Sequence, residues 1–299
     1  MTSILCIGMS AMDAIYRVPA IPAAPAKVLA TGFSECGGGM AANASVAVAR
    51  LGGAASYWGR VGADALGERI LSDLAVEGVD IGTVRRVAGR LSPSAAILVL
   101  PDGERLVCAY NDPALDSDPG WLPLTRVAGF DGVLADVRWP AGARAVLDAA
   151  RAAGVAAVVD CDVGPVKDLL DLAGRASHTV FSEPGLNLAA GGEDPGKALA
   201  RIAAHVEGVV GVTLGAAGFL WLEGQKERRV VAPRIVAVDT LAAGDVWHGA
   251  FTLALGEGSP IVDAARFANA AAALKCTRPG GRTGAPSRVD VLRLLHETY

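Results

Sequence analysis

Val238-Asp239-Thr240-Leu241-Ala242-Ala243-Gly244-Asp245-Val246-Trp247-His248-Gly249-Ala250-Phe251 is the stretch that decides the fold of this chain. The residues that lead into it, 230–238, are rich in Val, Ala and Ile and predict an extended segment. From Asp245 onward, small and apolar residues recur at helical spacing as far as Leu255. Residues 242–244 therefore lie where a loop turns into a helix. Such a turn directs backbone N–H groups and the positive end of the helix dipole toward one point, where an anion can bind.

Asp245 stands beside this expected anion site. The small residues before it, which let an anion come close to the amides, are Ala242, Ala243 and Gly244. A carboxylate in this place suits phosphoryl transfer, because the amides stabilise charge on the transferring group while the carboxylate accepts the proton of an attacking hydroxyl. The simpler alternative for an Asp in a small-residue turn is that it only caps the helix.

The composition suits one compact α/β domain over residues 1–299. Apolar residues make up 52% of the chain and 37 residues are glycine, which favours a large core and many tight turns. A net charge of −4 argues against nucleic acid as a general partner, because there is no basic excess to displace counterions. No uncharged apolar run is long enough to span a membrane, and residues 3–8 resemble a first strand rather than a secretory signal. We therefore expect a cytoplasmic protein.

Strand-like and helical runs alternate in the middle of the chain. The strand-like runs are 131–137, 155–160 and 178–182, and the helical runs are 141–153, 165–174 and 194–206. This β-α-β rhythm predicts a mainly parallel sheet with helices on both faces. Arg138 follows one strand-like run, and Asp13 ends the turn expected from Gly8 to Asp13 after the first strand; ligands gather at such strand ends. For Asp13, a turn-capping role is an equal alternative.

A glycine cluster at 37–39 opens the second informative run. Small and apolar residues follow it to Leu51, and Gly52-Gly53 closes the run, which predicts a helix with a glycine stop. Glycines at the start of the helix allow a ligand to lie against the backbone. A glycine-rich loop alone would be weak evidence for a binding site.

Two motifs occur in order along the chain, Gly-Gly-x-x-x-Asn at 38–43 and Asp-Thr-x-Ala-Ala-Gly-Asp at 239–245. Together they resemble the signatures of the ribokinase-like (PfkB-type) carbohydrate kinases, with Ala242 in place of a more usual Gly. The resemblance covers essentially the whole chain. It implies a ribokinase-like three-layer αβα sandwich with a mainly parallel central sheet, and a small β-sheet lid from roughly 14–36 and 91–112. Lids of this family often pack in pairs, so we expect a homodimer through the lid.

The resemblance also implies roles for individual residues. Asp245 is implied to be the catalytic base, beside an anion hole made by residues 242–244. The residues implied to bind the sugar are Asp13, Gly38, Gly39, Asn43 and Asn111, the last of these standing near Ala109, where the family leads us to expect an Asn. The residues implied to bind ATP are Thr213, Gly215, Gly218, Asn269 and Gly280.

Metal ions are expected from the same resemblance. Mg²⁺ should accompany ATP, but the family's Asn-x-x-Glu motif is replaced by Ser-Glu-Pro-Gly at 182–185, which leaves Glu183 for part of its role. Asp239 and the loop at Gly280 are implied to frame a K⁺ site.

Lys27 in the expected lid and Arg138 are cations where a neutral sugar would want hydroxyl partners. The alternative for both is solvation or pairing with a carboxylate such as Asp136. The segments that carry a closer resemblance, to the sulfofructose kinases of bacterial sulfoquinovose breakdown, are Asp-Val-Arg-Trp at 136–139, Phe-Ser-Glu-Pro-Gly-Leu at 181–186 and Ala-Leu-Lys-Cys-Thr-Arg-Pro-Gly-Gly-Arg-x-Gly at 273–284.

This closer resemblance implies ATP-dependent phosphorylation of the 1-hydroxyl of 6-deoxy-6-sulfofructose, with Lys27 and Arg138 binding the sulfonate. A kinase of the same fold that acts on another ketose, a phosphosugar or a keto-deoxy sugar acid would use the two cations equally well. A sugar-binding protein that has lost its chemistry is the third alternative, and an intact Asp245 argues against it.

Overall fold

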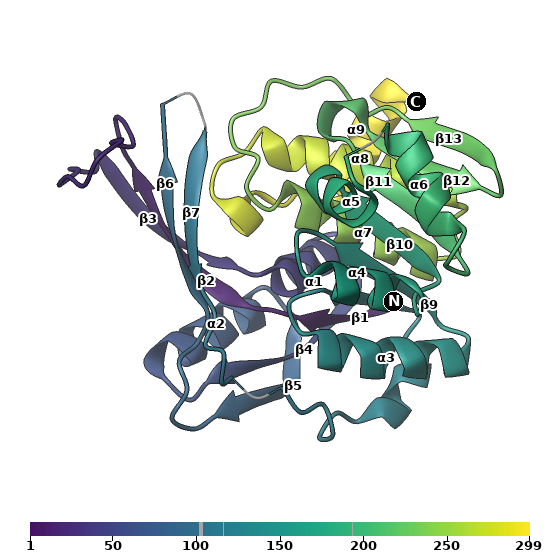
Figure 1. Cartoon of the computed structure of the whole chain (residues 1–299), viewed down its shortest axis with the longest axis horizontal. Helices are drawn as coiled ribbons and strands as arrows, with labels where there is room; N and C mark the ends of the chain where they lie inside the picture. Colours follow the sequence, from purple (N-terminus) through teal and green to yellow (C-terminus); the bar gives the residue numbers. More distant parts are fainter. Residues whose placement is uncertain (102–103, 116, 193) are drawn as a thin grey trace.

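Nine strands form the central sheet of the structure, a computed structural model that describes residues 1–101, 104–115, 117–192 and 194–299. Within these residues the strands lie in the order β13 (Lys226–Val230), β12 (Phe219–Glu223), β11 (Val209–Thr213), β10 (His178–Ser182), β9 (Ala156–Cys161), β8 (Gly132–Asp136), β1 (Ser3–Gly8), β4 (Ala54–Gly62) and β5 (Asp80–Val87). Neighbours from β11 to β5 are parallel, whereas β12 is antiparallel to both of its neighbours. The predicted mainly parallel sheet is confirmed (Figure 1).

Helices cover both faces of this sheet and complete three layers (Figure 1). The helices on one face are α1 (Met40–Arg50), α2 (Ala65–Val76), α7 (Ala243–Gly256), α8 (Ile261–Cys276) and α9 (Arg288–Thr298). Those on the other face are α3 (Pro140–Ala153), α4 (Val166–Ala173), α5 (Glu183–Ala190) and α6 (Pro195–Ala203). Strand β1 contributes to both cores because its side chains alternate: Ile4 and Cys6 pack on the first face, and Leu5 and Ile7 on the second.

A separate four-stranded sheet, which we call the lid, extends to one side of the sandwich (Figure 1). Its strand order is β3 (Gly32–Gly38), β2 (Ala11–Arg17), β6 (Ser94–Val99) and β7 (Arg105–Tyr110). On its inner face Ile15, Cys36 and Ile97 are buried together, and Leu241 packs against them. The lid therefore contacts the loop that enters α7. Of the expected lid segment 91–112, residues 102 and 103 lie outside the described residues.

Two local predictions were wrong. Asp13, expected in a turn, lies within β2, where the β-favouring residues Ile15 and Tyr16 continue the strand and pair it with β3 and β6. The extended segment expected over 230–238 is a strand only at Val230; the rest is irregular, in keeping with Pro233, which cannot donate to a strand ladder.

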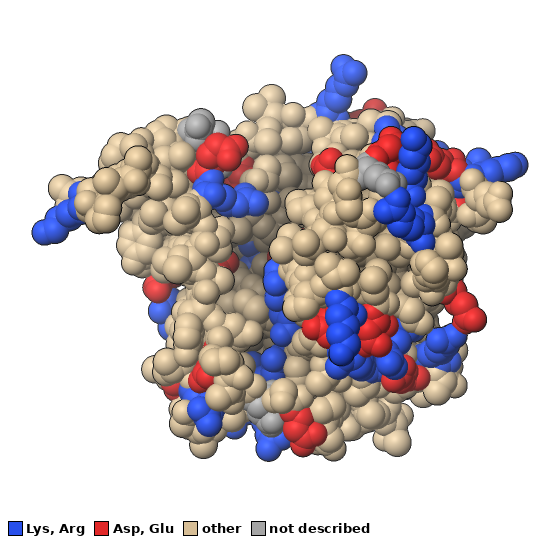
Figure 2. All heavy atoms as spheres, viewed as in Figure 1, with Lys and Arg blue, Asp and Glu red and all other residues tan. Residues whose placement is uncertain are grey.

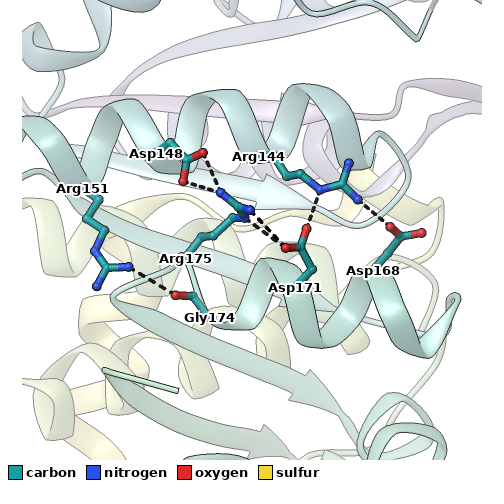
Figure 3. A network of polar contacts seen from close by, with 7 residues as sticks. All are labelled: Arg144, Asp148, Arg151, Asp168, Asp171, Gly174 and Arg175. Atoms are coloured by element: carbon teal, nitrogen blue, oxygen red, sulfur yellow. Dashed lines mark hydrogen bonds and ion pairs between the residues drawn. The ribbon is translucent and has the colours of Figure 1, made fainter. Parts of the chain in front are cut away.

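Ion pairs link α3 to α4 and the residues that follow it on the outer face of the sandwich (Figure 3). Arg144 contacts Asp171 and lies 2.7 Å from Asp168, and Arg175 lies 2.6 Å from Asp148 and 3.1 Å from Asp171. These side chains are all partly exposed, so each pair adds little to stability. They hold two neighbouring helices in place without burying an uncompensated charge.

No helix within the described residues combines the length and the apolar character that a membrane crossing requires.

The crossing of α1 and α7 gives a test of the packing. A Cβ added at Gly249 would lie 2.5 Å from the carbonyl oxygen of Ala44, which is backbone and has little freedom to move. We expect Gly249→Ala to lower the free energy of unfolding by about 1–2 kcal/mol, because overpacking outweighs the better helix propensity of Ala. Gly129→Ala is the matched control, since a Cβ there meets no atom within 4 Å. Equal urea midpoints for both variants and the wild type would contradict this packing.

Candidate active site

The loop before α7 holds its backbone in a strained conformation. Among the described residues, Ala242 alone of the non-glycine residues has a positive φ, at 63° with ψ 12°. This left-handed conformation costs an Ala roughly 1 kcal/mol or more, so neighbouring contacts must enforce it. The Asp239 carboxylate accepts a hydrogen bond of 2.8 Å from the Leu241 amide, and the Ala243 amide donates to the Thr240 carbonyl at 3.2 Å.

The next two amides of α7 are free. The Val246 amide donates to the Ala242 carbonyl at 3.0 Å, but the amides of Gly244 and Asp245 have no partner within the described part of the chain. They lie at the positive end of the α7 dipole. Unpaired amides at this position can bind an anion, which makes them the candidate anion hole that the sequence predicts at residues 242–245.

Asp245 lies in the first turn of α7 and receives a hydrogen bond of 2.7 Å from the Asn43 side-chain amide on α1. Burial raises the pKa of Asp245 to about 7, and the negative charges of Asp160 and Asp162 add to the rise. The hydrogen bond from Asn43 and the proximity of His248 oppose it. A carboxyl with a pKa near neutral pH can accept a proton and release it again, as a general base must.

The neighbouring carboxylates Asp160 and Asp162 stand at the C-terminal end of β9, and the sequence analysis missed them. His248 Nδ1 lies 2.8 Å from the Gly244 carbonyl and 3.3 Å from Asp160 Oδ2. Because a carbonyl only accepts hydrogen bonds, Nδ1 carries the proton. Burial lowers the pKa of His248, and burial raises that of Asp160 well above its ordinary value. The signal for this cluster was present in the sequence, since both Asp residues fall at the end of a predicted strand.

Asp136 joins three elements at the same edge of the sheet. Its carboxylate accepts hydrogen bonds from the amides of Met9 at 2.8 Å, Ala41 at 3.0 Å and Arg138 at 2.8 Å. A Cβ at Gly8 would overlap this carboxylate, so the close approach requires glycine there. Asp136 thus fixes the glycine loop at the start of α1 against the ends of β1 and β8.

Four of the residues expected to bind sugar come together at that glycine loop. A Cβ at Gly38 would lie 2.3 Å from a carboxylate oxygen of Asp13, and Gly39, with φ 90°, caps α1 one turn before Asn43. Burial raises the pKa of Asp13 to about 6, and the charge of Arg282 opposes the rise. The side chains of Asp13 and Asn43 thus reach one region from the lid and from α1.

Arg282 is a third residue to which the sequence analysis assigned no role. It is 3% exposed, its guanidinium lies against Gly37, and its Nη1 has no partner within the described residues. Nothing local in the sequence indicates this burial, because Arg282 reaches Gly37 from the far end of the chain.

Three other residues expected to contact the sugar do not lie at the glycine loop. Lys27 is exposed in the lid loop between β2 and β3, and Asn111 is exposed just after β7. Arg138 is paired with Asp162 at 3.1 Å rather than with Asp136, and both side chains are 36% exposed. Ala109 stands opposite Ala95, which in turn stands opposite Asp13, so small side chains border Asp13 on the inner face of the lid.

A cavity of about 760 Å³ opens beside the anion hole. Its lining includes Gly244 of α7 and, of the residues expected to bind ATP, Thr213, Gly215, Gly218 and Asn269. Asn269 is buried with its side-chain oxygen accepting from Trp247 at 2.8 Å and its nitrogen donating to the Val230 carbonyl at 3.0 Å, so it shapes the wall. A cavity of this size suits a nucleotide. Figure 2 shows another hollow, between the lid and the sandwich; the residues that line the cavity all belong to the sandwich and its loops.

The residues expected at metal sites are not gathered together. Glu183 is exposed at the start of α5, whereas the Asp239 carboxylate accepts hydrogen bonds from the amides of Gly280 at 2.9 Å and Gly281 at 3.2 Å. Gly280, expected at the nucleotide, is therefore engaged at this turn. No group of three or more His, Cys, Asp or Glu side chains in the described ranges is placed to hold a metal ion.

Comparison with known proteins identifies the family to which the chain is similar. Residues 1–288 match the family described as pfkB family carbohydrate kinase. The chain is 30% identical to the ribokinase of Bacillus subtilis, covering 99% of this chain and 100% of that protein. It is 27% identical to fructokinase-1 of Oryza sativa, covering 89% and 90% of the two chains.

Two solved structures are similar to this chain over nearly their full length. A protein of Agrobacterium tumefaciens assigned as a ribokinase has a TM-score of 0.95 and 40% identity, with 99% of this chain and 98% of that chain covered. The Arabidopsis thaliana ribokinase, complexed with ribose and ATP, has a TM-score of 0.86 and 26% identity, with 98% of each chain covered.

Proposed function

The chain belongs to the pfkB family of carbohydrate kinases, and on that basis we propose which residues of this ATP-dependent kinase do the chemistry. The observation that carries the proposal is Asp245, a carboxyl with a pKa of about 7 beside two unpaired amides. The cavity lined by Thr213 and Gly218 takes ATP, and it opens at Gly244, where the terminal phosphate meets the anion hole. The acceptor sugar lies on the other side of Asp245, against Asp13 and Asn43.

Phosphoryl transfer then follows from these positions. Asp245 takes the proton of the acceptor hydroxyl while the oxygen of that hydroxyl forms a bond to the γ-phosphorus of ATP. The bond between that phosphorus and the β–γ bridging oxygen breaks, and ADP leaves with the electron pair. The amides of Gly244 and Asp245 stabilise charge on the transferring group. The hydrogen bond from Asn43 holds the carboxylate in place toward the sugar.

Mg²⁺ enters as the complex with ATP. In nucleotide sites this ion keeps several waters and takes few protein carboxylates. Asp162 and Glu183, at the ends of β9 and β10, are the carboxylates we propose for the water shell of the ion. The lack of a three-carboxylate group among the described residues is compatible with this mode of binding.

We propose a pentose or ketohexose as the acceptor, the class that ribokinases and fructokinases act on. Within this class the finer proposal is 6-deoxy-6-sulfofructose, phosphorylated at its 1-hydroxyl. It rests on Arg138, whose partly exposed guanidinium stands at the end of β8 and presents N–H groups to an anion. Lys27 supports it less, because it lies exposed in the lid loop.

We also propose that two copies of the chain pair through their lids. Every residue of β7 is exposed although the strand includes Leu106 and Val107, and as an edge strand it presents unpaired backbone groups. Phe33 of β3, the strand at the opposite edge of the lid, is also 58% exposed. A second lid would cover the apolar side chains along β7.

Asp245→Asn tests the base. Turnover should fall by at least about a thousandfold, while ADP binding measured by calorimetry stays near the wild-type value. The variant should also be the more stable protein. Burial raises the pKa of Asp245 to about 7, whereas in the unfolded chain this carboxyl ionises at about pH 4. The wild type therefore loses stability as the pH rises from about 4 to about 7.

The Asn variant lacks that loss. Its unfolding temperature should therefore exceed that of the wild type by a few degrees at about pH 8, and by less at about pH 5. Near-normal turnover would refute the role of Asp245, and an inactive variant with a lower unfolding temperature would show damage to the fold instead.

Arg138→Ala tests the anionic acceptor. The substrates are ribose, fructose, fructose 6-phosphate, a keto-deoxy sugar acid and 6-deoxy-6-sulfofructose, each assayed by coupled ADP detection. We expect the sulfonated ketose to give the highest kcat/KM, and Arg138→Ala to raise its KM by about tenfold or more without a matching change for fructose. Arg293→Ala, on the exposed face of α9, is the control. Equal turnover of fructose 6-phosphate, or an unchanged KM, would remove the sulfonate proposal and leave the kinase intact.

The lid dimer is tested by sedimentation velocity at micromolar concentration. The wild type should sediment as a dimer, and Leu106→Lys should shift it toward monomer by placing a charge in the interface. Leu170→Lys, at an exposed leucine of α4, is the matched control and should remain dimeric. A monomeric wild type would contradict the proposal.

A further inference from the structure

Lys275, near the C-terminal end of α8, has no exposed surface. Its ammonium nitrogen lies 2.8 Å from the Asp239 carbonyl oxygen, 3.3 Å from Asp239 Oδ2 and 3.5 Å from the Arg278 carbonyl oxygen. Burying an ammonium is costly unless oxygen atoms replace its water. Here two backbone carbonyls and one carboxylate do so.

These oxygens are the ligands that a hard monovalent cation takes. They lie at the place where Asp239 and the Gly280 loop are expected to frame a K⁺ ion. The residues present do not fit that ion, because the Lys275 ammonium already binds both oxygens that Asp239 offers on this side. A positive charge is thus supplied by the chain itself.

The ammonium is connected to the anion hole through Asp239. The same carboxylate accepts hydrogen bonds from the amides of Gly280 and Gly281 through Oδ2 and from the Leu241 amide through Oδ1. Leu241 directly precedes Ala242, the residue held in the left-handed conformation. A shift of Asp239 would therefore move Leu241 and Ala242, and with them the unpaired amides at the start of α7.

The backbone around Asp239 is tied to the same helix end. The amides of Val238 and Asp239 donate to the Cys276 carbonyl at 2.8 and 3.1 Å. These contacts bring two chain segments together, the end of α8 and the loop before α7. The carbonyl oxygens of Asp239 and Arg278, one from each segment, point toward the Lys275 ammonium. Carbonyl dipoles aligned in this way repel one another unless a cation lies between them.

The charges around this point favour the ionised pair. Burial alone would raise the pKa of Asp239, but the Leu241 amide, the Lys275 charge and the amides of the Gly280 turn outweigh it and lower the pKa. Burial lowers the pKa of Lys275, and Asp239 opposes that fall. The other titratable groups that face the ammonium are the thiols of Cys276 and Cys36.

We propose that Lys275 is a tethered monovalent cation that positions the loop before α7, so that this kinase works without an alkali-metal ion. The proposal rests on the kinase activity. The simpler alternative is that Lys275 only caps the C-terminal end of α8, as basic residues near helix ends often do. In that case the loop before α7 would not depend on its charge.

The first test uses the wild type. Turnover is measured at matched ionic strength in KCl, NaCl, NH₄Cl and tetramethylammonium chloride, the last being too large for a carbonyl cage. We expect kcat to agree within about twofold in all four salts, since the cation site is already filled. Stimulation by K⁺ of about tenfold or more would overturn the proposal without any variant.

The second test replaces the charge. Lys275→Met keeps the volume and removes the cation, whereas Lys275→Ala also opens space. In tetramethylammonium chloride both should lose about 100-fold in kcat with a much smaller change in the KM of the sugar, because the displaced loop misplaces the anion hole. K⁺ or NH₄⁺ should restore turnover to Lys275→Ala and not to Lys275→Met.

The control is Lys197→Met, at an exposed lysine of α6, which should match the wild type. Loss of activity in Lys275→Ala that no cation restores, or full activity of Lys275→Met, would overturn the proposal. If the wild type and Lys197→Met phosphorylate no sugar in the same assay, the proposed function fails and not the role of Lys275.

Discussion

Two backbone amides that must stay unpaired set the main constraint on this structure. In the proposed mechanism the amides of Gly244 and Asp245 serve the reaction only while they have no protein partner. A relaxed loop would give free amides at the start of a helix such a partner. Their exposure requires the left-handed backbone at Ala242, which is itself unfavourable for an alanine. Asp239 opposes this relaxation, because it fixes the Leu241 amide on one side and the turn after α8 on the other.

Carboxylates gathered at one end of the sheet, those of Asp160, Asp162 and Asp245, form the second constraint, because their negative charges repel one another. The side chain of Asp162 is 36% exposed, whereas burial raises the pKa values of Asp160 and Asp245, and this repulsion adds to the rise. In the free protein this favours protonated carboxyls and costs stability near neutral pH. A magnesium–ATP complex is itself a net anion, so the cluster would accept it only with the Mg²⁺ ion between the carboxylates and the phosphates. In that arrangement the ion would relieve the repulsion among the carboxylates, and the cluster would favour the loaded state over the free one.

Local patterns in the sequence predicted the sandwich and the elements that build the site. The small residues at 242–244, the glycines at 37–39 and the β-α-β rhythm each report on a neighbouring backbone conformation, which local sequence determines. Lys275, Arg282 and the pairing of Arg138 with Asp162 were not predicted, because each contact joins segments distant in the sequence. Asp160 and Asp162 are a different case, because the sequence does predict their position at the end of a strand and the sequence analysis did not use it. Asp13 was misplaced because a strand began sooner after β1 than the turn signal indicated.

The pairing of Arg138 with Asp162 bears on how an anionic sugar would be recognised. The Arg138 guanidinium is already paired, so a sulfonate has to displace Asp162 from it or share the guanidinium with Asp162. Asp162 also accepts a hydrogen bond of 2.8 Å from the Ser182 hydroxyl. Breaking a partly exposed ion pair costs little, whereas a bidentate contact with an anion in a closed site gains more. Asp162, once released, would be free to face the waters of Mg²⁺, the role proposed for it above. Sugar binding and metal binding would then be coupled through one side chain, so that an anionic acceptor prepares the site for the nucleotide it needs.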